Sequence, residues 1–405
     1  MTAPYAAAAP ADWSARADEA ACSVTRMFGQ RLFFIPGTHI AAIERPSSRL
    51  KNLARPWHYW WQAHYVDCLV DAGRRELARG TRFDGGSRPS AGQLASHLVT
   101  GIRLRNFLTF VNNYYDDMAW LALSTLRLEK LADETRMPGR RRNARVRRSL
   151  TLQFDSASTD DLGGGTFWSK KRDFKNTPAT APVALYYART GNTAKAQMLV
   201  DWLHAKLFDP AQGMYQDGLR INSDGKVLLE AAIYTYNQGP VLGALLELGG
   251  EANLDRAAAL VDAVARHLTR PAVQASGRTA AVLRCDGTGD GGLFAGILAR
   301  YLALAANDGR LHGPTRATAA ALVTETAQAF WDGRRPVGAG EPLARQDARQ
   351  GAQLVFSVFP ETPADGTYPP GAAVELSTQL QAWMVLEAAA AVGDPVPSPK
   401  PDPAN

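Results

Sequence analysis

The stretch PVLGALLELGGEANLDRAAALVDAVARHL, residues 240–268, contains the pattern that decides the fold. Residues 240–248 are apolar on nearly every side, so a helix formed by them must be buried on most of its surface. Residues 252–268 repeat apolar side chains at spacings of three or four and carry their charges off that stripe, which predicts a helix with one solvent-facing side. The stretch therefore predicts a pair of helices, one inside the molecule and one outside.

The same alternation continues along the chain. Strand-like patterns bounded by turns are nearly absent, whereas helical periodicity recurs from one end to the other. Helix pairs with one inner and one outer member build a closed ring around a buried barrel. We therefore predict an all-α toroid, with an irregular solenoid of helix hairpins as the alternative. Solvent-facing helices are expected at 12–28, 192–206 and 314–331, and buried helices near Met118, Leu293 and Leu380.

Composition limits the remaining possibilities. The 405 residues are 46% hydrophobic and 21% charged, which is ordinary for a globular protein with a large core. No apolar run approaches the roughly 20 residues needed to span a bilayer, so we expect no membrane insertion. We predict one domain over residues 1–392 and a proline-rich, disordered tail over 393–405.

The N-terminal segment and the cysteines indicate in which cellular compartment the protein is expected. The start MTAPYAAAAPADW lacks the basic and apolar stretches of a secretion signal. The sequence as written thus predicts a cytoplasmic protein, or a secreted or cell-envelope protein whose leader was removed. Cys22, Cys68 and Cys285 are odd in number and widely spaced, which predicts buried free thiols rather than a disulfide framework or zinc site.

The formal charge of +6 raises the possibility of a nucleic-acid partner. Much of the excess lies in one segment, Arg136–Arg148, which lacks interleaved aromatic residues that would stack on bases. We interpret this segment as a solvated helix face or a contact for an anionic glycan, and we expect no nucleic acid as partner.

Polar segments rich in aromatic residues or glycine precede several of the buried helices. In a toroid, parallel inner helices begin at one rim, so these segments are expected to converge over one end of the barrel. Helix caps also favour Asn, Asp and Gly, but they do not require Trp or Tyr. The segments are NNYYDD (112–117), GGGTFWSKKRDFKN (163–176), YTYNQG (234–239) and CDGTGDGG (285–292).

Asp116 and Asp117 are the candidate catalytic residues. Two neighbouring carboxylates at the start of a buried helix are costly unless they are paired, hydrogen-bonded or functional. Their adjacency favours the separation of about 5–5.5 Å found in retaining glycosidases over the ~6.5–9.5 Å of inverting enzymes. Like charges this close also raise one pKa, which supplies a protonated acid beside an ionised nucleophile. The alternative is that Asp116 caps the helix and Asp117 favours its positive end.

The other segments supply candidate substrate-binding residues. Sugar rings stack on Trp and Tyr, while Asn, Gln, Lys and Asp bind hydroxyl groups. A core position for Trp168 and a capping role for the amides are the alternatives. The loop at 286–292 is not a calcium loop, because Ile297 stands where the bidentate Glu is needed. The candidate binding residues are Tyr115, Trp168, Lys175, Asn176, Tyr236, Asn237, Gln238 and Asp290.

Other catalytic chemistries find no support in the sequence. The seven histidines form no HExxH motif and no pair at ligand spacing, so no metal site is expected. A nucleophile elbow of the GxSxG type is also absent.

Taken together, five segments resemble glycoside hydrolase family 76, the endo-α-1,6-mannanases. They are YYDDMAWLAL, GGGTFWSKKRDFKN, YTYNQGPVLGALLEL, GDGGLFAGILARYL and ELSTQLQAWMVLEA, in the order of the family. The resemblance implies an (α/α)₆ barrel that hydrolyses α-1,6-mannosidic linkages with retention and without a cofactor. It also implies that Asp116 is the nucleophile and Asp117 the acid/base. The expected partner is an α-mannan polysaccharide or oligosaccharide, bound by a monomer.

Three rival functions remain open at this stage. A transglycosylase would use the same aspartates and pass the glycosyl group to another sugar. A mannan-binding protein without activity would not need two costly adjacent carboxylates. A sugar epimerase on the same fold relies on histidines, which the motif segments lack. Yeast-type mannan and the α-1,6-mannan core of actinobacterial lipoglycans both fit as substrates.

Overall fold

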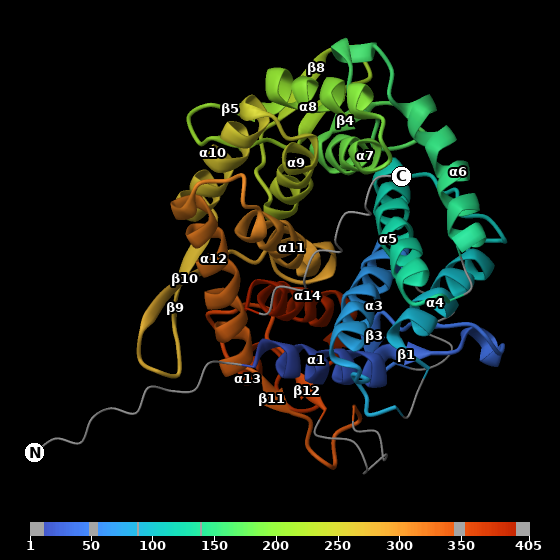
Figure 1. Ribbon diagram of the computed structural model, residues 1–405, viewed down its shortest axis with the longest axis vertical. Coiled ribbons are helices and arrows are strands. Elements are labelled where there is room, and N and C mark those ends of the chain that lie inside the picture. The colour runs from blue at the N-terminus through green and yellow to red at the C-terminus, as the bar shows by residue number, and fades with distance from the viewer. Residues whose placement is uncertain (1–11, 48–55, 87–88, 138–139, 344–352, 394–405) are drawn as a thin grey trace, which may run out of the picture.

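The computed structural model describes residues 12–47, 56–86, 89–137, 140–343 and 353–393 (Figure 1). Within these residues, six long helices form an inner ring and six more pack outside it. The inner helices are α3 (Tyr59–Arg79), α5 (Tyr115–Glu134), α7 (Thr177–Arg189), α9 (Thr235–Leu248), α11 (Phe294–Asn307) and α14 (Leu376–Gly393). The outer helices are α1 (Trp13–Phe28), α4 (Ala91–Arg105), α6 (Arg140–Ala157), α8 (Thr193–Leu207), α10 (Glu251–His267) and α12 (Gly313–Asp332).

The inner ring is closed. Each inner helix packs against the next one along the chain, from α3 through α5, α7, α9 and α11 to α14, and α14 also packs against α3. The outer helices lie around this ring, as Figure 1 shows for α6, α8, α10 and α12. The predicted all-α toroid is therefore confirmed as an (α/α)₆ barrel. The solenoid alternative is wrong, because a solenoid would not return α14 to α3.

The helix patterns read from the sequence match the observed elements closely. The deciding stretch at 240–268 forms α9, which is almost wholly buried, and α10, which exposes one side. The expected helices at 12–28, 192–206 and 314–331 are α1, α8 and α12. In α9, Gly239 and Gly243 lie against the ring of Tyr301 on α11, and a Cβ at either glycine would approach it within 2.8 Å. These two glycines let the inner helices pack closely.

The strands in the described residues are short and pair antiparallel in small sheets between the helices. The hairpin pairs are β1 (Gly29–Gln30) with β2 (Ile40–Ala41), β5 (Phe208–Asp209) with β6 (Met214–Tyr215), and β9 (Thr269–Val273) with β10 (Thr279–Leu283). β3 (Glu44–Arg45) pairs with β13 (Val374–Glu375), and β11 (Arg335–Pro336) with β12 (Leu354–Val355). A three-stranded sheet joins β4 (Phe174–Asn176), β7 (Gly218–Ile221) and β8 (Val227–Glu230). One further short helix is α13 (Ala364–Thr367).

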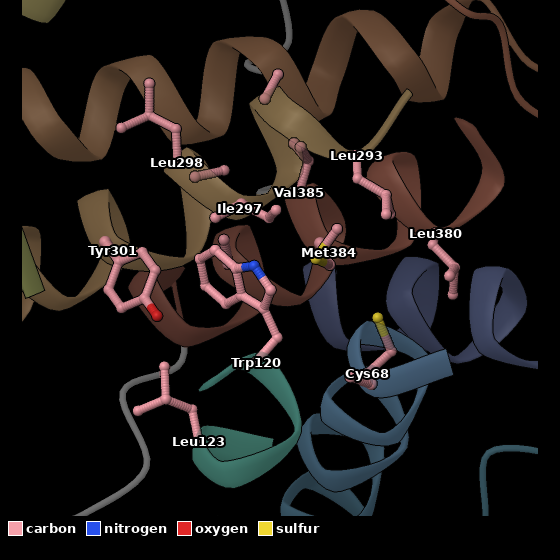
Figure 2. Packing of buried hydrophobic residues seen from close by; sticks show 14 of the residues in the cluster. Cys68, Trp120, Leu123, Leu293, Ile297, Leu298, Tyr301, Leu380, Met384 and Val385 are labelled. Carbon is pink, nitrogen blue, oxygen red and sulfur yellow. The ribbon is translucent and has the colours of Figure 1, made fainter. Parts of the chain in front are cut away.

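The core fills the inside of the ring. Figure 2 shows side chains from four inner helices meeting there, including Cys68, Trp120, Ile297 and Met384, all of them buried. Cys68 and Cys285 are buried free thiols as predicted, whereas Cys22 is only partly buried. The large apolar core explains why the fold needs no disulfide.

The last helix ends one residue later than the predicted domain boundary. α14 ends at Gly393, so this residue belongs to the helix and not to the predicted tail, while the rest of the predicted tail, 394–405, lies outside the described residues. Among the helices that the structure describes, none has the length and apolarity to cross a membrane.

A cluster of buried ion pairs connects three inner helices. Arg300 on α11 donates to Asp67 and Asp71 on α3, at 2.7 and 2.8 Å, and Arg127 on α5 pairs with the same two aspartates. Burial would raise the pKa of Asp71, but the two arginines outweigh burial and hold it at about 2. This contribution to stability is thus complete above the ordinary pKa of 3.8 and is lost as the pH falls through about 2.

We predict that Arg300→Met lowers the free energy of unfolding by about 3 kcal/mol, because it leaves two buried carboxylates to share one arginine. Denaturant unfolding at neutral pH measures this loss. The matched control is Arg278→Met, which removes a more exposed pair with Glu325 and should cost less than about 1 kcal/mol. Equal losses in the two variants would show that the cluster does not hold the ring.

Candidate active site

Asp116 and Asp117 lie in the first turn of α5, and each carboxylate has its own donors. Asp116 accepts a hydrogen bond from the backbone N–H of Asp117 at 2.9 Å on one oxygen, and from Trp168 Nε1 at 2.9 Å on the other. Asp117 accepts from Asn112 Nδ2 at 2.7 Å. The different partners fix the two side chains in different orientations, so the two groups are not equivalent.

The same surroundings give the carboxyl groups of Asp116 and Asp117 different pKa values. Burial raises the pKa of Asp116 to about 7, although the donors from Asp117 and Trp168 oppose that shift. The pKa of Asp117 lies well above its ordinary value because of burial and, next, the negative charge of Asp116. Asp116 therefore ionises first, and Asp117 is the group that keeps a proton near neutral pH.

Trp168 joins the aspartate pair to the loop before α7. Its carbonyl accepts from the backbone N–H of Tyr115 at 2.8 Å, and its ring lies 4.9 Å from that of Tyr114. Trp168 is partly exposed, so it is not the core residue that the alternative interpretation required. The side chain of Tyr115, by contrast, is buried in the hydrophobic core. We therefore withdraw Tyr115 as a substrate contact; its neighbour Tyr114 is the exposed ring.

Lys175 lies beneath the glycine-rich loop and is fully buried. Its Nζ donates to the carbonyls of Thr159, Asp161, Gly164 and Gly165 at 2.6–3.1 Å, and also to the hydroxyl of Thr159. Burial lowers the pKa of this ammonium group to about 8, so it stays protonated at neutral pH. All its donors are thus engaged within the protein, and we correct its predicted role from sugar binding to support of the loop.

The glycines of this loop are required by their positions. Gly164 and Gly165 have positive φ angles of 127° and 76°, which side chains rarely tolerate. A Cβ on Gly165 would also lie 2.7 Å from the ring of Trp202 on α8. The loop therefore follows a path that glycine permits, and this path delivers Trp168 to Asp116.

Two of the predicted amides serve the backbone instead of a ligand. Asn176 caps α7 by accepting from the backbone N–H of Ala179 at 3.1 Å. Gln238 bonds both the N–H and the carbonyl of Tyr215, and also the carbonyl of Tyr234. Both side chains are buried. The capping alternative therefore holds for Asn176, whereas Gln238 holds the backbone of Tyr215 against α9, and we remove both from the binding set.

Tyr236 and Asn237 do lie at the rim that carries the aspartates. The ring of Tyr236 stacks on Phe294 at 3.9 Å. Burial raises the pKa of Tyr236 well above its usual value, and the charges of Asp217, Asp116 and Asp290 add to the shift. Tyr236 thus lies among three carboxylates from different parts of the chain.

Asp217 is a rim carboxylate that the sequence did not reveal. It lies between β6 and β7, and Asn237 Nδ2 donates to it at 3.2 Å. Burial raises the pKa of Asp217 to about 6. It lies in the connection between two small sheets, β5–β6 and β4–β7–β8, and only the fold of this connection brings it near Asn237.

Asp290 is held by the start of α3. Trp60 Nε1 and Trp61 Nε1 both donate to one of its oxygens, at 2.9 and 2.8 Å, and His58 lies 3.7 Å away. Burial opposes ionisation of Asp290, but His58 and the two indoles outweigh burial and lower its pKa. Its negative charge also raises the pKa of Asp116 and Asp117. Sequence reasoning missed these tryptophans, although the aromatic run WHYWW (57–61) at the start of a long helix was a usable signal.

The starts of α5, α9 and α11 and the loop before α7 therefore meet at one rim, as the sequence predicted, and the start of α3 joins them there. Through these contacts the rim gathers carboxylates and partly exposed aromatic rings. Among the described residues, no group of three or more His, Cys, Asp or Glu side chains is placed to hold a metal ion. The arrangement suits acid–base and nucleophilic chemistry on a ring-shaped, polar substrate that stacks on aromatic faces.

Comparison with known proteins agrees with this picture. The sequence model of glycosyl hydrolase family 76 matches residues 41–392. No curated protein gives a significant match to the sequence.

Solved structures with similar folds come from several bacteria. The family 76 α-1,6-mannanase of Salegentibacter sp. HEL1_6 has a TM-score of 0.73 and 24% identity, covering 94% of this chain and 100% of that chain. An inactive variant of that enzyme, with two consecutive aspartates replaced by asparagine, was solved with α-1,6-mannotriose. A protein of Listeria innocua has a TM-score of 0.72, 23% identity and coverage of 95% and 98%. A family 76 mannosidase of Bacteroides thetaiotaomicron has a TM-score of 0.70, 18% identity and coverage of 94% and 98%.

We predict that Lys175→Met lowers the free energy of unfolding by about 2–4 kcal/mol, because it leaves several buried carbonyls of the glycine loop without a donor. Denaturant unfolding is the measurement. Lys171→Met is the matched control, since Lys171 is exposed and nearby, and it should change stability by no more than about 0.5 kcal/mol. A stable Lys175→Met protein would overturn the supporting role that we assign to Lys175.

Proposed function

The chain belongs to glycosyl hydrolase family 76, and from this premise we propose that it is a retaining, endo-acting hydrolase of α-1,6-mannosidic linkages. Mannan and the mannan cores of lipoglycans are the proposed substrates. Membership of the family makes the protein a glycoside hydrolase, and the linkage, the endo action and the stereochemistry are our proposal. The observation that carries it is the adjacent pair Asp116 and Asp117, whose different donors support different roles.

The proposed reaction begins with Asp117 in its protonated form. Asp117 donates its proton to the glycosidic oxygen as the bond to the anomeric carbon breaks, and Asp116 forms a bond to that carbon. Asp117, now ionised, then takes a proton from water, and the resulting hydroxide displaces Asp116 from the anomeric carbon. Two displacements leave the product with the original α configuration. The pKa order of the two aspartates supports this assignment of roles.

The rim also offers groups that can orient the sugars. Trp168 is partly exposed beside Asp116, and Trp60 and Tyr236 lie across the rim with their ring centroids 6.4 Å apart. We propose that mannose rings stack on these aromatic faces. Asp290, ionised and fixed by the two indoles of α3, is a candidate acceptor for sugar hydroxyl groups. The inactive Salegentibacter variant with bound mannotriose supports a mannose-containing ligand for this fold.

We predict that Asp116→Asn and Asp117→Asn each lower kcat on linear α-1,6-mannan by about 10³-fold or more, because each removes a group that reacts with the substrate. Product size by chromatography and the first-formed anomer by NMR are the measurements, and the wild type should release short α-anomeric oligosaccharides. Asp133→Asn is the control, since Asp133 is an exposed aspartate near the other end of the same helix.

Two outcomes of this experiment would contradict the proposal. Substantial activity in Asp116→Asn would show that Asp116 is not the nucleophile. Binding of mannan without cleavage by the wild type, or transfer of the glycosyl group to an added acceptor in place of water, would favour a binding protein or a transglycosylase.

The pH profile gives an independent test. Asp116 must be ionised to attack, so kcat/KM should rise as the pH increases through about 7, and it should fall at higher pH as Asp117 loses its proton. Trp168→Phe removes a donor that stabilises ionised Asp116, so the pKa of Asp116 rises. The acidic limb should then move to higher pH by about half a unit to one unit. An acidic limb that stays in place, or moves to lower pH, would be inconsistent with Asp116 as the nucleophile.

A further inference from the structure

Two loops expose bulky apolar side chains, and one of them leads into the helix that carries the aspartate pair. One loop connects β1 to β2 and the other follows α4, on the same side of the molecule (Figure 1). In the first loop, Phe33 is 58% and Phe34 is 70% exposed, and in the second, Phe107 is 89% and Leu108 is 63% exposed. We call these four residues the apolar patch. Gathered exposed apolar side chains of this kind mark a surface that interacts with a partner.

All four residues of the apolar patch have the left-handed backbone conformation. Phe33 and Phe34 are consecutive residues with positive φ angles of 46° and 62°, and Phe107 and Leu108 have 54° and 64°. Bulky residues rarely adopt this conformation, which glycine or asparagine would occupy at lower cost. Two independent loops thus keep large apolar residues where the backbone disfavours them.

Internal hydrogen bonds hold the loops in place. Arg103 Nε donates to the carbonyl of Leu108 at 3.0 Å, and Asn106 Nδ2 donates to two carbonyls further along the loop. In the first loop, Thr38 Oγ1 donates to the carbonyl of Ile35 at 2.6 Å. The side chains of the patch are therefore presented by ordered backbone.

A pocket of about 420 Å³ opens beside the patch. Its lining is mainly apolar and includes Leu32 and Trp57, together with the three arginines Arg31, Arg45 and Arg105. Trp57 connects it to the rim, because its ring lies 5.5 Å from that of Tyr59 at the start of α3. The pocket beside the patch is therefore connected to the start of α3 by one aromatic contact.

The two loops of the patch carry arginines and no carboxylate. Arg31, Arg103 and Arg105 lie on the two loops or directly before them. Neither 29–43 nor 89–115 contains an aspartate or glutamate. The two loops themselves are therefore complementary to a negatively charged partner.

We propose that the apolar patch docks this protein onto the surface of an anionic lipid bilayer. Phe33, Phe34, Phe107 and Leu108 enter the boundary between headgroups and acyl chains, where aromatic side chains are favoured. The arginines contact the headgroup phosphates. This is peripheral binding by loops and needs no membrane-spanning helix. It does not depend on the proposed hydrolysis, but it would hold the aspartate pair close to a glycan anchored in that bilayer.

The chemistry of the patch favours a bilayer over a soluble glycan or a folded protein. A glycan subsite needs polar side chains beside the rings, and the amide of Asn106, which directly precedes Phe107, is already bonded to the backbone. Other exposed apolar residues also lie on connections from an outer to an inner helix, namely Val227, Leu228 and Leu229 on β8 and Val273 on β9. A broad lipid surface can meet several such loops together.

The test is co-sedimentation of the full chain with vesicles of phosphatidylglycerol and with vesicles of phosphatidylcholine. We expect binding to the anionic vesicles that weakens with salt, and little binding to the neutral ones. The variant F33N/F107N/L108N should lower the partition onto phosphatidylglycerol by about tenfold or more, because three apolar side chains no longer enter the bilayer. Asparagine tolerates the positive φ angles, so this variant should fold.

A matched control separates the patch from general hydrophobicity. L152N/M198N replaces two exposed apolar residues on the outer helices α6 and α8, and it should bind vesicles like the wild type. No sedimentation of the wild type with anionic vesicles, or equal losses in the two variants, would overturn the proposal. Weaker binding of soluble α-1,6-mannan by the patch variant, with no vesicle binding by the wild type, would reassign the patch to the glycan. Hydrolysis of soluble mannan is measured separately, so failure of docking and failure of the proposed activity are distinguishable.

Discussion

The inner ring of six helices is closed, and this closure determines where outer helices, polar residues and the active site can lie. Because α14 packs against both α11 and α3, every inner helix has two inner neighbours and can be covered by outer helices only on its far side. The inner helices must therefore be largely apolar, and a charged side chain in their middle, such as Arg300, needs partners on a neighbouring inner helix. The connections that lead from an outer to an inner helix meet at one rim, which is why residues as distant in sequence as Trp60 and Asp290 touch.

Gathering buried carboxylates at the rim lowers the stability of the folded protein. Asp116, Asp117 and Asp217 are all buried enough to raise their pKa, so their charged forms oppose folding at neutral pH. The starts of the inner helices offset part of this cost, because helix N-termini carry partial positive charge. Donors such as Trp168 and Asn112 stabilise particular oxygens. The rim thus combines conditions that are unfavourable for stability and suitable for acid–base chemistry.

The sequence predicted the parts of the molecule that depend on periodicity and adjacency. The stripe at 252–268 and the apolar run at 240–248 were enough to predict one outer and one inner helix, and Asp116 and Asp117 are adjacent in any fold. Residue type alone could not tell which polar side chain faces the substrate end. Lys175 and Gln238 have the chemistry of sugar ligands, but in the folded protein both donate their hydrogen bonds to backbone carbonyls. Asp217 was missed because the connection between β6 and β7, and no local pattern, carries it to the rim.

The same geometry explains why catalytic groups and exposed apolar loops occur at one end of the barrel. Outer helices leave the rim free, and the connections into the inner helices can lengthen without disturbing the ring. The loop after α4 illustrates the consequence, since Phe107 at its tip is followed five residues later by Asn112, which orients Asp117. Tyr59, which precedes Trp60 on α3, anchors this loop by donating to the carbonyl of Phe110 at 2.7 Å. A partner that engages the tip of this loop is therefore held at the aspartates by a short, ordered stretch of chain.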